Sequence, residues 1–265
     1  MIRRESNSTH PPDVWCLITQ IDHAQLAHQL AESWNHSAFK PDSWNQLLHA
    51  IRHHDDGWLK WDQHVHFDSD GRPIAFNEMD ASDSLEIWRL SIEQSVDAGA
   101  LAAYCVAKHF LLLADSTPGN EADQFRAQFT RRCNDWKKQI GDDLLCQNAV
   151  QALRWFDWLS LYLCMRSAAC EITIPEAPIA VSAFEQLVLH PVSNGRAIDA
   201  ADTKASDFEL VDEFSIPTVF SCSSWIWTVQ ELKLSVDAKL FPKHSASIEA
   251  DVKLSLQLQP DSSLR

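Results

Sequence analysis

The feature that most constrains the fold is a long segment, residues 143–170, that is apolar around nearly its whole helical circumference. Such a helix would expose apolar side chains on a surface whichever face it turned to solvent, so it is expected to be central and buried. Asp157 is the exception, because it lies on an inward row between Leu153 and Leu161. Burial of an unpaired carboxylate is costly. Asp157 therefore requires a cation, a hydrogen-bond donor or a proton.

Periodicity and capping patterns predict further helices before this segment. The expected elements are a strand over 14–21, a helix capped by Asp22, a helix capped by Ser43 and stopped by Gly57, a long ordered loop over 62–83, one or two helices over 84–114 with Gly99 as a break, and a helix over 121–139. Residues 232–236 and 252–256 alternate as strands do. We expect a mainly α fold, with a helical domain over 14–170 and a small antiparallel β appendage over 171–265.

Helical phase turns several polar side chains toward apolar faces. In the segment 41–54 the apolar row continues onto His54 and Asp55, whereas His53 falls on a more polar row beside it. His23 shares a face with apolar residues of its helix, and His109 lies on an apolar row of the segment 84–114. Imidazole and carboxylate together suit a divalent transition metal such as Fe, Mn, Zn, Co or Ni. The set predicts a site for one or two such ions.

Each of these residues also has an ordinary interpretation when it is taken alone. An inward histidine such as His109 is more often a hydrogen-bonded core residue than a ligand. Asp157 could form an ion pair with Arg154 or Arg166 instead. The complete set favours a metal, because one cation would satisfy several costly buried groups at once.

Composition limits the partners and the compartment. The formal net charge is −15, which argues against nucleic acid and anionic membranes as partners. No apolar run is long enough to span a bilayer, and no signal peptide is expected. The seven cysteines form no CxxC pair, so we interpret them as reduced thiols of a cytoplasmic protein. A small molecule remains the expected partner, and a homo-oligomer is compatible with the sequence.

The order His, then His-Asp, then Asp on successive helices resembles the HD superfamily of metal-dependent phosphohydrolases. HAIRHHDDGW resembles the doublet of that superfamily, and LRWFDWLSLYL resembles its final ligand helix. The resemblance implies an HD-like helical bundle with four metal ligands, which are His23, His54, Asp55 and Asp157. His109 matches an extra ligand of two-metal members, and His53 could be another. ITQIDHAQLAHQLAESW, RHHDDGWLKWD, DSDGRPIAFNEM and RWFDWLSLYLC more closely resemble a bacterial family of unknown function that is distantly related to HD proteins.

The resemblance implies a hydrolase that cleaves phosphoric esters in a small, anionic substrate. Asp55 would bridge the ions if two are present, and Asp157 would orient or deprotonate the attacking water. His53 or Asp56 would act as a general acid or outer-shell base.

Arg72, in the loop over 62–83, and Lys60 are the expected contacts for the anionic group of the substrate. Many HD enzymes carry a lysine directly after the glycine of the doublet, where this chain has Trp58. Two alternatives remain open. One is a di-iron oxygenase that uses His23, His53, His54 and His109. The other is a non-catalytic binding or scaffold module with a structural metal.

Overall fold

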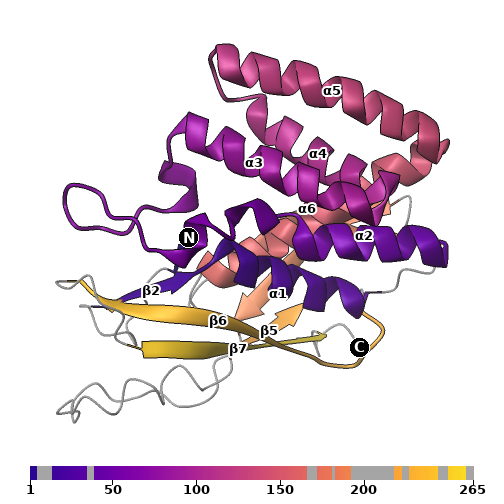
Figure 1. Ribbon diagram of the computed structural model, residues 1–265. Coiled ribbons are helices and arrows are strands. Elements are labelled where there is room, and N and C mark those ends of the chain that lie inside the picture. Colours follow the sequence, from indigo (N-terminus) through magenta and orange to yellow (C-terminus); the bar gives the residue numbers. More distant parts are fainter. Residues whose placement is uncertain are drawn as a thin grey trace, which may run out of the picture.

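In a computed structural model of the protein, the described residues are 1–4, 14–34, 39–165, 172–180, 183–191, 218–222, 227–243 and 250–260. The helices in these ranges are α1 (Gln20–Glu32), α2 (Pro41–His53), α3 (Ala81–Ser95), α4 (Ala100–Ala114), α5 (Asn120–Ile140) and α6 (Asp143–Met165). Figure 1 shows them stacked on one face of a β-sheet, with α1 beside the sheet and α5 farthest from it. The expectation of a mainly α fold is confirmed.

α6 is the central helix that its apolar sequence predicts. It contacts α1, α2, α4 and α5, and most of its side chains are buried, including Phe156 and Asp157. One stripe still reaches solvent, where Arg154 is exposed and Trp158 keeps 44% of its surface accessible. The burial is therefore wide but does not extend around the whole helix.

Both predicted helix caps were wrong by a few residues. α1 is capped by Thr19, whose hydroxyl accepts from the backbone N–H of Asp22 at 3.0 Å. Asp22 itself lies in the first turn, where a negative charge interacts favourably with the helix N-terminus. α2 begins at Pro41, which needs no hydrogen-bond donor at that position, so Ser43 lies inside the helix rather than at its cap.

The break at Gly99 is confirmed. Gly99 has a φ of 120° and separates a 3-10 turn at Val96–Ala98 from α4. Such a φ favours glycine over residues with a Cβ. The side chain of Gln46 from α2 lies against this break, and its Oε1 accepts from the backbone N–H of Leu101 at 3.0 Å.

The described strands form one sheet in the order β1-β2-β6-β7-β5-β4-β3. Their bounds are β1 (Ile2–Arg4), β2 (Val14–Ile18), β3 (Ile172–Ala180), β4 (Ala183–Pro191), β5 (Thr218–Cys222), β6 (Leu232–Pro242) and β7 (Ala250–Pro260). The C-terminal antiparallel strands are confirmed, although β5 and β7 pair in parallel. The sheet also includes β1 and β2, and β2 pairs with β6, which was not predicted. The division between residues 170 and 171 and the likeness to an HD bundle stay predictions.

β6 and β7 follow the alternation that the sequence predicts. Leu234 and Val236 of β6 are buried, whereas Lys233 and Asp237 on either side of this pair are exposed. On the solvent face, Lys253 of β7 lies 2.9 Å from the Asp237 carboxylate. The buried face of the sheet therefore lies toward the helices, and β6 contacts α1.

Two features of the described residues concern membrane crossing and the cysteines. Within the described ranges, no helix combines the length and the apolar character that crossing a membrane would need. The six described cysteines, Cys16, Cys105, Cys133, Cys146, Cys164 and Cys222, are buried and unpaired thiols.

The Gln29 side chain of α1 forms two hydrogen bonds with the backbone of β6. The pairing of β2 with β6 extends only to Lys239, so the described part of β2 does not reach Ser235. There the Gln29 amide donates to the Ser235 carbonyl at 2.9 Å and accepts from the Ser235 N–H at 3.1 Å. Nearby, the Trp227 indole N–H donates to the Leu30 carbonyl at 2.8 Å. These bonds fix α1 on the sheet.

We expect Gln29→Ala to lower the free energy of unfolding by about 1–3 kcal/mol, because it leaves one backbone donor and one backbone acceptor of Ser235 without their partners. Urea unfolding measures the change. Gln25→Ala is the matched control, since Gln25 is also half-buried on α1 and its side chain forms no hydrogen bond with the described residues. Equal losses for the two variants would contradict the role given to Gln29.

Candidate metal centre

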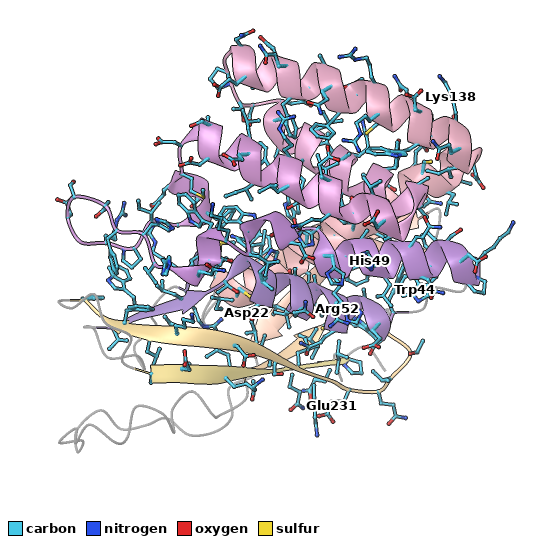
Figure 2. The ribbon with its side chains drawn as sticks, viewed as in Figure 1. Asp22, Trp44, His49, Arg52, Lys138 and Glu231 are labelled. Atoms are coloured by element: carbon cyan, nitrogen blue, oxygen red, sulfur yellow. The ribbon has the colours of Figure 1, made fainter. Side chains whose placement is uncertain are left out.

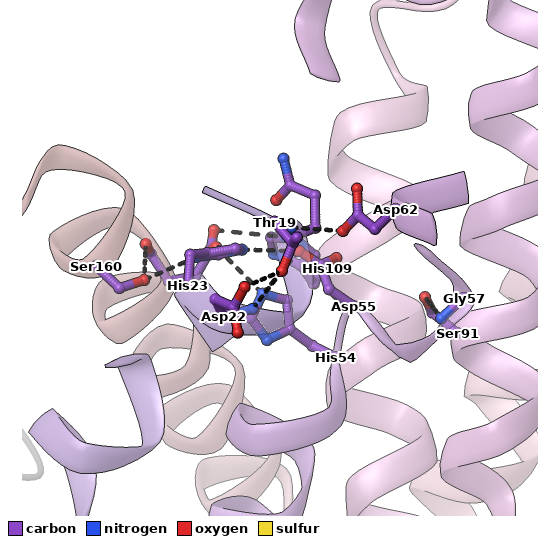
Figure 3. A network of polar contacts seen from close by, with 12 residues as sticks. Thr19, Asp22, His23, His54, Asp55, Gly57, Asp62, Ser91, His109 and Ser160 are labelled. Carbon is purple, nitrogen blue, oxygen red and sulfur yellow. Dashed lines mark hydrogen bonds and ion pairs between the residues drawn. The ribbon is translucent and has the colours of Figure 1, made fainter. Parts of the chain in front are cut away.

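Side chains from four helical segments meet at one buried point (Figure 3). α1 contributes one of them, the end of α2 contributes an adjacent pair, and α4 and α6 contribute one each. These five residues, here called the His-Asp cluster, are His23, His54, Asp55, His109 and Asp157. All five are buried, with at most 7% of their surface accessible. The helical-phase argument placed these same side chains inward.

The closest contacts within the cluster join histidine Nε2 atoms to carboxylate oxygens. His23 Nε2 lies 2.8 Å from Asp55 Oδ2, and His54 Nε2 lies 3.2 Å from Asp157 Oδ1. Cross contacts are longer, at 3.6 Å from His54 Nε2 to Asp55 and 3.8 Å from His23 Nε2 to Asp157. One ligand atom from each of His23, His54 and Asp55 lies within 4.8 Å of the others, a spacing that could hold a metal ion.

His109 lies at the edge of this arrangement. Its Nε2 is 4.0 Å from Asp157 Oδ2, and its ring centre is 5.6 Å from that of His54. Among the described residues its Nδ1 has no hydrogen-bond partner, although the atom is buried. The ordinary interpretation, a hydrogen-bonded core histidine, does not fit this orphaned nitrogen.

The end of α2 explains how two adjacent residues both face the cluster. His54 keeps a helical backbone after the last residue of α2, so its ring follows the inward row of Ile51. Asp55 then leaves the helix, with φ −106° and ψ 15°, and a 3-10 turn at Asp56–Trp58 follows. The change of direction sends the Asp55 carboxylate toward α1 rather than around the helix.

The charges of the cluster shift the pKa values of its members in opposite directions. Burial alone would lower the pKa of His54, but the Asp55 and Asp157 carboxylates outweigh it and raise this pKa to about 9. Burial would likewise raise the pKa of Asp157, yet the hydrogen bond from His54 and the neighbouring histidines hold it below its usual range. Burial lowers the pKa of His109 to about 4 despite Asp157, which favours a neutral ring there.

Hydrogen bonds on the far side of each ring determine where its proton lies. The Ser160 hydroxyl donates to the Asp157 carbonyl at 2.8 Å, so its oxygen accepts from His23 Nδ1–H at 3.0 Å. His54 Nδ1 lies 2.9 Å from the Ile51 carbonyl, which can only accept, so this nitrogen is also protonated. The Nε2 atoms of His23 and His54 are therefore left to face the carboxylates.

This arrangement fits a bound cation. A neutral imidazole that is protonated at Nδ1 has only a lone pair at Nε2. A lone pair that faces a carboxylate oxygen at 2.8 or 3.2 Å is repelled unless a positive charge, as a proton or a metal ion, lies between the two atoms. Neutral imidazoles and carboxylates are also the donors that divalent transition metals accept.

The expected general acid or base residues lie beside the cluster and not within it. His53 Nδ1 is 2.9 Å from Asp56 Oδ2, and their side chains keep 31% and 24% of their surface accessible. The His53 ring also packs on His49, 4.4 Å away between centres. Figure 2 shows His49 on α2. His53 and Asp56 thus form a half-exposed pair next to the doublet.

The expected substrate-binding cations lie farther along the chain. Arg72 is exposed, with its guanidinium 3.1 Å from Asp68 and 3.4 Å from Glu78. Its loop is fixed to β1, since Arg3 donates to the Pro73 carbonyl at 3.2 Å. Lys60 is exposed after the 3-10 turn that ends at Trp58. Roles for Arg72 and Lys60 stay predictions.

The ion pair considered as an alternative for Asp157 is not found with Arg154. Within the described residues, all of the ion-pair contacts of the Asp157 carboxylate are with histidines, and Arg154 is exposed. Arg166, the other candidate, lies outside the described residues.

Sequence reasoning missed two buried residues of this region. Ser160 is fully buried one turn after Asp157. The sequence signal that could have revealed it is a small polar residue on an otherwise apolar helix face. Asp62 is 6% exposed and accepts from the backbone N–H of Gln20 at 2.7 Å, which satisfies a donor at the start of α1. No periodicity indicated Asp62, because it lies in a 3-10 turn of three residues, Trp61–Gln63, which is too short to show a pattern.

We expect Ser160→Ala to weaken divalent metal binding by about 10–100-fold, because His23 Nδ1–H loses the acceptor that keeps Nε2 free for a ligand bond. Titration calorimetry with Zn²⁺ on chelator-treated protein measures the affinity. Asn148→Ala serves as the control, since it also removes a buried polar side chain from α6. Wild-type affinity in Ser160→Ala would contradict the role of the hydroxyl.

Comparison with known proteins gives a family but no activity. No curated protein and no solved structure matches the chain. Residues 1–243 match a protein family, so the match extends over all four segments that carry the cluster. The function of this family is unknown, and the match does not test a relationship to the HD superfamily. The chain belongs to this family, Protein of unknown function (DUF3891).

Proposed function

We propose that the protein is a metal-dependent hydrolase, of the type that cleaves phosphoric esters in small anionic substrates. The observation that carries the proposal is the pair of imidazoles whose Nε2 atoms face two buried carboxylates. A purely structural core gains little from four such groups, because their desolvation offsets much of their attraction. Relatedness to the HD superfamily, which the order of these residues suggests, is part of the proposal.

His23, His54 and Asp55 would hold a divalent transition metal, with Asp157 and His109 as further candidate ligands. The metal would supply Lewis acidity, that is, a lowered pKa of bound water and a contact for the ester oxygen. The Asp157 carboxylate, whose Oδ1 lies 3.2 Å from His54 Nε2, would orient or deprotonate the attacking water. Ser160 and the Ile51 carbonyl orient the two imidazoles from behind.

Proton delivery to the leaving group is assigned to the half-exposed pair of His53 and Asp56. The Asp56 carboxylate orients the imidazole through Nδ1, so the other ring nitrogen is the one that can exchange a proton with substrate. Partial exposure suits this role, since the residue must meet both the substrate and solvent. The oxygenase alternative would use His53 as a metal ligand, but His53 is half-exposed and lies outside the group of His23, His54 and Asp55, which gives that alternative less support.

We expect Asp157→Asn to reduce metal-stimulated release of phosphate by about 10²–10⁴-fold, since an amide cannot accept the proton of the attacking water. The assay uses purified protein with Mn²⁺, Zn²⁺, Co²⁺, Ni²⁺ or Fe²⁺ against a broad panel of phosphate esters. Asp143→Asn, at the exposed start of α6, is the control and should keep full activity.

The outcomes separate the three functions considered. Wild-type protein that binds metal without hydrolysing any ester, but shows an iron-dependent electron paramagnetic resonance signal, would favour the oxygenase. Asp157→Ala protein that loses metal and thermal stability together, from an inactive wild type, would favour a structural metal in a binding module. A stable, folded Asp157→Ala variant without turnover would support catalysis.

A further inference from the structure

The turn after the doublet is attached to a helix that contributes nothing to the His-Asp cluster. The backbone N–H of Gly57 donates to Ser91 Oγ of α3 at 3.0 Å, and Ser91 is fully buried. Gly57 comes two residues after Asp55, inside the 3-10 turn. Figure 3 shows the contact between Gly57 and Ser91 set apart from the cluster itself.

Gly57 permits this contact because it has no side chain. A Cβ at this position would lie 2.1 Å from the Ile87 carbonyl oxygen and 2.8 Å from the Ser91 nitrogen. Both atoms belong to the backbone of α3 and cannot turn aside. Gly57 is not among the glycines with a positive φ, so close approach rather than backbone conformation requires it.

The contact reaches the metal ligands through short, hydrogen-bonded backbone. The N–H of Trp58 donates to the Asp55 carbonyl at 2.9 Å, which closes the turn on the ligand residue. On the other side, His54 is bonded to Ile51 of α2. The doublet is therefore held between α2 and a turn that is fixed on α3, and it meets His23 from a third helix at 2.8 Å.

We propose that Ser91 is a positioning residue for the metal centre. It sets the separation between the Asp55 carboxylate and the two imidazoles by fixing the turn on α3, without touching the cluster. The inference rests on the metal site of the proposed function. A shift of the turn by a few tenths of an ångström would move Asp55 relative to His23, and ligand geometry at that scale decides metal affinity.

Ser95 provides a matched control on the same helix. It is 1% exposed, and its hydroxyl donates to the Ile92 carbonyl of α3 itself at 2.7 Å. Ser95→Ala and Ser91→Ala each remove one buried hydroxyl and one hydrogen bond, so both are expected to lower the melting temperature. Only Ser91→Ala removes a bond between α3 and the turn of the doublet.

The experiment is titration calorimetry with Zn²⁺ and Co²⁺ on chelator-treated, full-length protein, far below the melting temperature. We expect Ser91→Ala to bind each metal about 10-fold or more weakly than wild type, whereas Ser95→Ala stays within about twofold. The visible absorption of the Co²⁺ protein is the second readout, because it reports ligand geometry. It should change in Ser91→Ala alone.

Ser91→Cys leaves no cavity, since sulfur is slightly larger than oxygen, but it replaces the hydroxyl with a weak acceptor. It should follow Ser91→Ala in affinity, and it replaces that variant if Ser91→Ala fails to fold. Wild-type affinity and absorption in the folded Ser91 variants, or an equal loss in Ser95→Ala, would overturn the positioning role. Wild-type protein that binds no metal would overturn the metal centre as well, whereas metal binding without hydrolysis would remove only the proposed activity.

Discussion

Two buried contacts between an imidazole nitrogen and a carboxylate oxygen determine what the rest of the structure must do. His23 meets Asp55, and His54 meets Asp157, where at most 5% of any of these residues is accessible. Desolvated charges of this kind cost more than hydrophobic packing would, unless every partner is in place. A metal ion would be attracted to both carboxylates and, in place of the protons, to the lone pairs of both Nε2 atoms. This arrangement of buried charges lowers stability in a core that has only structural roles, but it is favourable for binding a metal ion.

The surrounding fold restricts each of these groups from a different direction. α1 is bonded to the sheet through Gln29, α2 directs the doublet inward, and α6 carries Asp157 and Ser160 one turn apart. The C-terminal strands, whose purpose the sequence leaves open, thus contribute to the site by fixing the helix that bears His23. Preorganisation of this kind lowers the cost of bringing ligands together when an ion binds.

The inward polar residues could be predicted from sequence because helical phase is a local property. His23, His54, His109 and Asp157 each continue an apolar row of their own helix, and the structure places all four in the cluster.

Helical phase could not reveal that Ser91 accepts from the turn after the doublet or that Asp62 accepts from the start of α1, because those contacts join separate elements. The pairing of β2 with β6 was hidden for the same reason, since its partners are more than 200 residues apart. The cap positions failed differently, because Thr19 and Asp22 are both good capping residues and only the backbone decides between them.

The residue after Gly57 packs in the protein interior, whereas the resemblance implies a substrate-binding residue at this position. The resemblance implies a lysine at this position, available to an anionic substrate, but Trp58 is 3% exposed and faces the protein interior. A buried indole at the end of the turn adds packing area to the hydrogen bond that Ser91 provides. The turn in this chain is therefore fixed from two sides and offers no positive charge of its own. Under the proposed function, recognition of an anionic group would come from the metal and from cations outside the doublet, so the metal would carry a larger share of substrate binding than the resemblance alone implies.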